Sequence, residues 1–401
     1  DGGSIINPTG HTGAGRWLMT WDHNRADVRD WGAQITNVSA PTFDSLPAIN
    51  AAINALPTHD FTNIIGPGAG SGGHIREGIV YFAGSGSGTG FVVTGTVYGS
   101  SNLRFEGDNF DQSKIALWPG TATNMSVPPT YVVRFCFNQT DGEPNQTFFT
   151  EVRHLAIYSG ENNPNSIPLF YVGCNGNGID HVILDGALQS GVIVADSLSI
   201  DHLTSLASCT QTGITVHGSY ALSCSDWDIE HPNYRGSTVV GGVAMATSNV
   251  DPNTGIPYPA VRVAGSQACT FANITTESTV VSLEIFDSSY ISVGMIHANP
   301  GCDGLSFANL PGSAVVNIHG NVEGVSIAGI YEGPTSGVPN VIDTSVGVWP
   351  ETGGQHVRAV NFTGTALRTS YYQDTHFQHA SADTLYASYA NIATASVADV
   401  Y

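Results

Sequence analysis

Residues 152–157 read VRHLAI, residues 179–184 read IDHVIL, and residues 200–205 read IDHLTS. The segment LSCSDW at 222–227 follows as a fourth copy, which we place in the same phase. The copies begin 27, 21 and 22 residues apart, a period that indicates stacked supersecondary units. Toward the end of each copy, apolar or small residues alternate with outward-pointing ones, which is the periodicity of a β-strand.

A second short apolar run precedes the later copies and recurs further along the chain. These runs are GVIV at 191–194, GITV at 213–216 and AVRV at 260–263. Two or three strands per turn of about 22 residues, with Gly and Asn at the corners, predict an all-β fold, a parallel β-helix. The gap between the last two runs exceeds one turn, so it holds either two turns or one turn with an insertion.

The charge balance limits the partners that this chain can have. It carries 12 Lys and Arg residues against 33 Asp and Glu residues, a formal net charge of −21. Nucleic acid and anionic membranes require clustered cations, so neither is an expected partner, whereas a polysaccharide is compatible. No run of 18 apolar residues is present, which predicts no membrane-spanning helix. The six cysteines lack metal-like spacing, and we interpret them as buried free thiols.

Four segments in the first third of the chain carry a family resemblance. They are VRDWGA at 28–33, AINAAI at 48–53, GIVYFA at 78–83 and FEGD at 105–108. Their order resembles the start of the pectate-lyase-like right-handed β-helix superfamily, and in particular of phage tail-spike polysaccharide depolymerases. The resemblance implies a right-handed solenoid with a short N-terminal helix that caps its open end. It also implies a homotrimer, located on the virion or secreted.

Three segments are expected along the chain. Residues 1–24 are rich in Gly, Asn and Thr and are interpreted as a linker or neck. Residues 25–367 form the capped solenoid, and residues 368–401, rich in Tyr, Ala and Thr, form a C-terminal association segment. The apolar residues Ile183 and Leu206 are expected to be exposed and to mark an interface between protomers.

The segment SDWDIE at 225–230 is the candidate catalytic site. Its two apolar residues are expected to face the core. The carboxylates of Asp226, Asp228 and Glu230 then point outward together, with neighbours about 6.6 Å apart along the strand. Aligning the strand runs that flank the long gap places Glu277 beside Glu230 on the next turn, about 5 Å away at the backbone. Crowded carboxylates raise one another's pKa, and a glycosidase needs one protonated and one ionised carboxyl group.

The same alignment places Asn273 beside Asp226 and Thr275 beside Asp228. Aromatic and basic side chains near the carboxylates could hold sugar hydroxyls or a uronate. The candidate substrate-binding residues are Trp227, Tyr234, Arg235 and Arg262, although Arg262 has the alternative of pairing with an acid.

The expected function is hydrolysis of glycosidic bonds in a bacterial surface or extracellular polysaccharide. Asp228 and Glu230 serve as acid and base, while Asp226 or Glu277 tunes them, and the 6.6 Å spacing favours inversion. A polysaccharide lyase that acts by β-elimination on a uronate is the alternative, with Tyr234 or Arg235 as the base. A third possibility is a spike that binds glycans without catalysis.

Histidines recur at one position of the repeat, at His154, His181 and His202, with Asn102 as a possible equivalent. We interpret them as stacked polar turn residues that bond backbone groups. A catalytic or metal-binding row is the alternative interpretation. No cofactor and no metal site are predicted.

Overall fold

The structure is a computed structural model of the chain. It describes residues 24–59, 75–135, 147–206, 209–230, 250–253, 257–277, 279, 281–299 and 314–332, together with the backbone of short strands outside these ranges. No helix among the described residues is long and apolar enough to cross a bilayer.

Most strands belong to one solenoid. They are β3 (Arg25–Asp27), β4 (Ile35–Asn37), β7 (Gly78–Phe82), β8 (Thr89–Val93), β9 (Val97–Gly99), β10 (Leu103–Gly107), β11 (Lys114–Leu117), β12 (Thr130–Phe135), β13 (Thr147–Phe148), β14 (Glu151–Tyr158), β15 (Ser166–Asp185), β16 (Gly191–Ser205), β17 (Ile214–His217), β18 (Ser223–Ser225), β19 (Trp227–Glu230), β22 (Val261–Ala264), β23 (Thr270–Glu277), β24 (Leu283–Phe286), β25 (Ser292–Asn299), β27 (Ala314–His319), β29 (Ser326–Glu332), β30 (Asn340–Asp343), β32 (Asn361–Phe362) and β33 (Ser370–Tyr371). Smaller elements are β1 (Ile5–Ile6), β2 (Trp17–Leu18), η1 (Val28–Trp31), α1 (Leu46–Ala55), β5 (Thr58–His59), β6 (Ile75–Arg76), β20 (Tyr234–Val240), β21 (Val243–Ser248), β26 (Ser306–Phe307), β28 (Asn321–Glu323) and β31 (His356–Arg358). In the solenoid, all described strand pairs are parallel except the antiparallel pair of β4 with β8. The predicted parallel β-helix is therefore confirmed.

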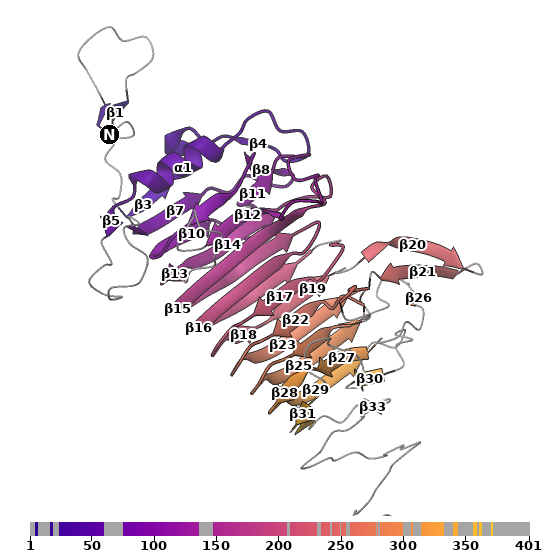
Figure 1. Cartoon of the computed structure of the whole chain (residues 1–401). Helices are drawn as coiled ribbons and strands as arrows, with labels where there is room; N and C mark the ends of the chain where they lie inside the picture. Colours follow the sequence, from indigo (N-terminus) through magenta and orange to yellow (C-terminus); the bar gives the residue numbers. More distant parts are fainter. Residues whose placement is uncertain are drawn as a thin grey trace, which may run out of the picture.

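The interior of the solenoid is one continuous apolar core. It extends from Ala26 in β3 to Ile330 in β29. Successive strands stack along the molecule from the N-terminal end (Figure 1), and each turn buries its alternate side chains against the turns on either side. Since every turn contributes the same inward columns, the core grows with the number of turns, as expected of a solenoid.

The helix α1 lies at the N-terminal end of the stack (Figure 1). It buries Ile49 and Ile53 in the end of the apolar core. The helix begins after Ser45, but its first free backbone amide, that of Leu46, donates to the carboxylate of Asp44 at 3.0 Å. The predicted capping helix is confirmed, and it covers backbone groups that would otherwise pair with another chain.

The fourth copy of the repeat is shifted by two residues from its predicted position. Pairing aligns Val152 with Ile179 and Ile179 with Ile200, as predicted. Ile200 pairs with Cys224, however, and not with Leu222. Trp227 and Ile229 still face inward, as predicted. The left-handed corner at Asp226 interrupts the alternation of side chains, however, so the shift places Cys224 at the inward first position and Ser225 beside the outward Asp201.

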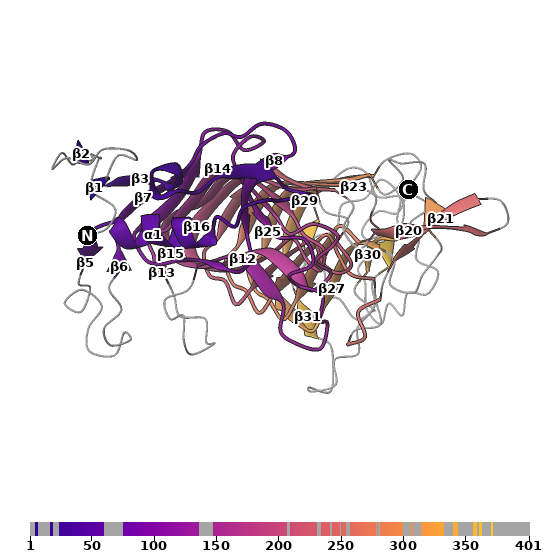
Figure 2. The same ribbon diagram turned by 90° about the horizontal axis from the view of Figure 1, so that it is seen from above.

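The long gap between the two later strand runs is one turn with an insertion. Val216 of β17 pairs directly with Val263 of β22. The inserted residues include the antiparallel strands β20 and β21, which project as a hairpin from the side of the stack (Figures 1 and 2). The insertion lengthens the surface of this turn without changing the register of the strands on either side.

The outer parts of the predicted organisation are only partly described. Pairing of β33 with β30 carries the parallel register as far as Tyr371, past the predicted boundary at residue 367. The rest of 368–401 and most of 1–24 lie outside the described residues, so their predicted roles stay predictions.

Leu206 is 37% exposed, but Ile183 is only 6% exposed, so the prediction that Ile183 is a surface residue was wrong. Among the described cysteines, all are free and buried, as predicted.

Candidate active site

The predicted acidic face is present on β19 and β23. Trp227 and Ile229 are buried in the core, whereas the intervening Asp228 and the terminal Glu230 are partly exposed. Glu230 pairs with Glu277 on the next turn, and Asp228 pairs with Thr275. Adjacent strands lie about 4.8 Å apart, so the two glutamates are close neighbours. The predicted alignment of these two turns is confirmed.

Asp226 differs from the other carboxylates because it lies in a corner, between the end of β18 and the start of β19. Its φ is 50°, in the left-handed region. One carboxylate oxygen accepts a hydrogen bond from Asn273 Nδ2 at 3.0 Å, and the other lies 3.5 Å from His202 Nε2. Asp226 is thus only two residues from Asp228 in sequence, but it has polar partners at the corner and does not continue a single straight strand.

Asp228 has the electrostatic environment of a general acid. Partial burial, together with the negative charge of Glu277, raises the pKa of its carboxyl group. Among the described side-chain atoms, its Oδ1 is one of a few that are buried without a hydrogen-bond partner. Both effects favour the protonated form. One carboxyl of the group is therefore held toward the acid form beside a second carboxylate, which is the division of roles that glycosidases use.

Trp227 does not contact the surface. Its side chain is 1% exposed, packs edge-on against Phe271 with ring centroids 5.4 Å apart, and donates from Nε1 to the carbonyl of Ile200 at 3.4 Å. The inference that it binds substrate was wrong, because an inward position on β19 makes it part of the core. Its role is to hold the strand that carries Asp228.

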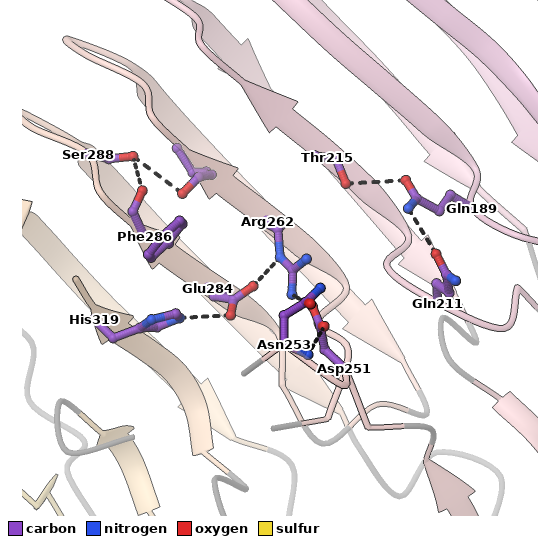
Figure 3. A network of polar contacts seen from close by, with 11 residues as sticks. Gln189, Gln211, Thr215, Asp251, Asn253, Arg262, Glu284, Phe286, Ser288 and His319 are labelled. Atoms are coloured by element: carbon purple, nitrogen blue, oxygen red, sulfur yellow. Dashed lines mark hydrogen bonds and ion pairs between the residues drawn. The ribbon is translucent and has the colours of Figure 1, made fainter. Parts of the chain in front are cut away.

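Arg262 is also absent from the acidic face. It lies on β22, which pairs with β17 and β24 rather than with β19. Its guanidinium donates to Glu284 and, at 2.7 Å, to Asp251 (Figure 3). The prediction that it binds substrate was wrong, and the alternative of an ion pair is what the structure shows. Tyr234 and Arg235 begin β20, but their side chains lie outside the described residues.

The contacts of Arg262 belong to a buried network. Glu284 is 1% exposed and lies 2.8 Å from His319 Nε2 (Figure 3). Burial alone would raise the pKa of Glu284, but the hydrogen bond from His319 and the positive charge of Arg262 outweigh it and hold that pKa below its ordinary value. Asp251 is 2% exposed and comes from the inserted segment, so this network attaches the insertion to the solenoid.

A further acid, which sequence reasoning missed, lies on the same outward column as Glu230. Register carries this column from Tyr158 through Asp185 and Leu206 to Glu230 and Glu277. Burial, with a smaller contribution from Glu161, raises the pKa of Asp185 to about 6. The available signal was its place at the end of a repeat copy, directly after IDHVIL. The acidic column is therefore longer than the segment 225–230 suggested.

The histidine position of the repeat is occupied differently from the prediction. His154, His181 and His202 do lie on successive turns, and Asp226 follows them in the same column because of the two-residue shift. Asn102 is not equivalent. Glu106 pairs with Arg153, so the next residue, Gly107, lies beside His154, and a Cβ there would be 2.1 Å from the His154 carbonyl oxygen.

These observations define a class of protein: a parallel β-helix with a capping helix and a column of partly buried carboxylates on its outer face. Neither a protein family nor a curated protein matches the sequence. Solved structures do match at the level of fold.

Several of the similar structures are phage tailspikes. The enzymatically active domain of bacteriophage CBA120 tailspike protein 2 matches with 12% identity and a TM-score of 0.42, over 94% of this chain and 49% of that one. The gp42 tailspike of Acinetobacter phage vb_AbaP_AS12 gives 12% identity and a TM-score of 0.42, over 90% and 62%. The A-module of the Azotobacter vinelandii mannuronan C-5 epimerase AlgE6 matches with 12% identity and a TM-score of 0.34, over 90% of this chain and 100% of that one. This chain spans about half of the longer tailspike, and similarity at this level concerns the fold alone.

Proposed function

We propose that this protein is a polysaccharide depolymerase that hydrolyses glycosidic bonds, with its reacting groups on the acidic face of β19 and β23. Asp228 is the general acid, and the observation that carries this assignment is its raised pKa beside a second carboxylate. Glu277 or Glu230 supplies the ionised partner, since these two pair across adjacent turns. Asp226 orients the corner through Asn273. The substrate is a bacterial surface or extracellular polysaccharide.

The geometry suits an inverting reaction. Asp228 and Glu277 are one strand spacing and two residues apart, a backbone separation of about 8 Å from the ideal spacings. Inverting glycosidases hold their carboxyl groups about 6.5–9.5 Å apart to admit a water molecule, and retaining enzymes about 5–5.5 Å. Water activated by the ionised partner would attack the anomeric carbon while Asp228 protonates the leaving oxygen.

The test uses single amide variants and a panel of bacterial capsular and extracellular polysaccharides. Asp228→Asn is expected to abolish the release of reducing ends. Of Glu230→Gln and Glu277→Gln, the variant that loses activity identifies which glutamate is the base. Asp196→Asn is a matched control, because Asp196 lies at another corner and accepts a hydrogen bond from Ser197. Full activity in Asp228→Asn would refute the assignment.

Two readouts separate hydrolysis from its alternatives. Hydrolysis generates reducing ends without the ultraviolet absorbance of an unsaturated uronate, whereas β-elimination generates both. Binding of a polysaccharide with no new ends in any member of the panel would support a glycan-binding spike instead. Activity is expected to fall as pH rises through the raised pKa of Asp228, because a general acid must be protonated.

The homotrimer and the location on a virion or outside the cell stay predictions. Leu206 is an exposed apolar residue in the column of Glu230, so an interface there would lie close to the proposed site. Light scattering of the purified chain is expected to give about three times the 42.0 kDa chain mass. A monomer mass would contradict the trimer and leave the proposed site within one chain.

A further inference from the structure

Three histidines at one corner of the solenoid are stacked on successive turns. The rings of His154 and His181 have centroids 5.5 Å apart, and those of His181 and His202 are 4.1 Å apart with 19° between their planes. All three residues have φ between 50° and 52°. A left-handed backbone is uncommon for residues that carry a side chain. Because all three histidines share this conformation, the bond from Cα to Cβ leaves the backbone in the same way on each turn.

A carboxylate lies among these rings. Asp180 Oδ1 is 2.6 Å from His181 Nδ1 and 3.8 Å from His202 Nδ1. His154, Asp180 and His181 each offer one ligand atom, and the three atoms all lie within 4.8 Å of one another. In a tetrahedral site with metal–ligand bonds of about 2.0–2.1 Å, ligand atoms are about 3.4 Å apart. Side-chain rotations that move these atoms by about 1 Å would therefore bring all three to bonding distance.

The electrostatic surroundings favour a cation. Asp201 pairs with Asp180 on the neighbouring turn, and its carboxylate accepts hydrogen bonds from the hydroxyls of Ser199 and Ser225. Arg153 pairs with Asp180 along the sheet, but its guanidinium donates to Glu106 at 2.6 and 2.9 Å. The negative charge at this corner is therefore spread over two adjacent turns, where a divalent ion would be attracted.

The donor set selects the kind of cation. Two imidazole nitrogens and one carboxylate oxygen are ligands of zinc and of neighbouring transition metals. Calcium and magnesium prefer oxygen ligands alone, in larger numbers. Three protein ligands also leave a position open for water or for a group on another molecule.

We propose that His154, Asp180 and His181 bind a divalent transition-metal ion of the zinc class. This assignment departs from the expectation that the histidines are only polar turn residues. It goes beyond the proposed hydrolysis and does not depend on it, because the acidic face uses different residues. His202 stacks on His181 from the next turn and also lies near Asp226, so the site adjoins the corner of the acidic face.

The test measures binding of zinc chloride and of nickel chloride to the untagged full chain after treatment with a chelator. Titration calorimetry is expected to show saturable binding of one ion per chain, with calcium chloride giving no comparable signal. A bound ion that prefers the folded state also raises the thermal midpoint. His154→Ala, His181→Ala and Asp180→Asn are each expected to weaken binding at least about tenfold, the loss seen even for outer-sphere partners.

His297→Ala is the matched control, because His297 is an exposed histidine on β25 beside Tyr331 and outside the corner. It is expected to bind zinc as the parent protein does. Circular dichroism and the thermal midpoint without metal verify that each variant folds. If a histidine variant does not fold, Asp180→Asn still tests the proposal. The proposal would be overturned if the parent protein showed no saturable binding of zinc or nickel. It would also be overturned if the three corner variants bound zinc as tightly as the parent protein does.

Discussion

Replacing Glu284 with glutamine is expected to lower the free energy of unfolding by about 3–5 kcal/mol, the cost of removing one partner from a buried ion pair. The carboxylate is 1% exposed and accepts from both Arg262 and His319. An amide offers one acceptor oxygen and turns an NH₂ donor toward one of these two donors. Arg262 would then be buried with the carboxylate of Asp251 as its remaining partner in this network, so the penalty includes poorly compensated charge.

The corresponding thermal shift follows from the chain length. Unfolding entropy of about 2.1 cal/mol/K per residue over 401 residues is about 0.84 kcal/mol/K. A loss of about 3–5 kcal/mol therefore lowers the midpoint by about 4–6 °C. Urea titration, read by tryptophan fluorescence, gives the free-energy difference directly, and a scanning thermal melt gives the midpoint.

The pH dependence of this difference has a definite sign. The folded-state pKa of Glu284 is held below its ordinary value, so the unfolded chain binds this proton more readily. The stabilisation is complete above the ordinary pKa of a glutamate and is lost as pH falls through the folded-state pKa. The gap between the parent protein and Glu284→Gln is thus expected to narrow in acid.

An exposed ion pair supplies the control. Arg29 is about half exposed and pairs with Asp27 at 2.6 Å, and Arg29→Gln is expected to change stability by less than about 1 kcal/mol. The double variant Arg262→Gln with Glu284→Gln should cost less than the sum of its singles, because the two residues interact. A Glu284→Gln protein within about 1 kcal/mol of the parent would refute the reasoning.

Three other predictions concern single residues. Burial raises the pKa of Asp185 to about 6, so the protein loses stability as pH rises through that value. Asp185→Asn should therefore raise the free energy of unfolding at pH 8 by up to about 3 kcal/mol. Equal stability of the parent protein and the variant at pH 8 would contradict this. Cys224 is buried with a raised pKa, so its thiol should resist alkylation until urea unfolds the chain, as mass spectrometry can show. Gly107→Ala, whose Cβ would be 2.1 Å from the His154 carbonyl oxygen, should cost at least about 1–3 kcal/mol in urea titration, whereas Gly84→Ala, with contacts of 3.4 Å or more, should cost less.

The fold was predictable because its signals are local and repeated. The alternation of apolar and polar residues around Asp228 is enough to assign the two faces of β19, and matching the flanking runs gives the pairing of Glu230 with Glu277. The phase of the fourth copy was not predictable from the repeat, because the turn from Ile200 to Cys224 is longer than the turn from Ile179 to Ile200. The wrong phase concealed that Asp226 occupies the same corner position as His202 on the preceding turn.

The errors at the candidate site have different causes. Burial of Arg262 depends on Asp251, which returns to the solenoid from an insertion whose course no periodicity describes. The raised pKa of Asp185 depends on the side chains that bury it, which the sequence does not identify. Its position in the outward column of Glu230 can be assigned only after the strand register is known. Trp227 was chosen for its chemistry as an aromatic, although the same alternation that located Asp228 placed it in the core.

The insertion between β19 and β22 has a consequence for how such a chain can evolve. Since Val216 pairs directly with Val263, the two ends of this turn keep the same register whatever the connecting segment contains. A new segment acquired by recombination would meet an unchanged scaffold, provided that it preserves or replaces the contact of Asp251 with Arg262. Sequence change can therefore accumulate in the insertion beside the acidic face without changing the register of the turns on either side. A lineage built in this way could exchange the segment beside the acidic face without passing through an unfolded intermediate ancestor.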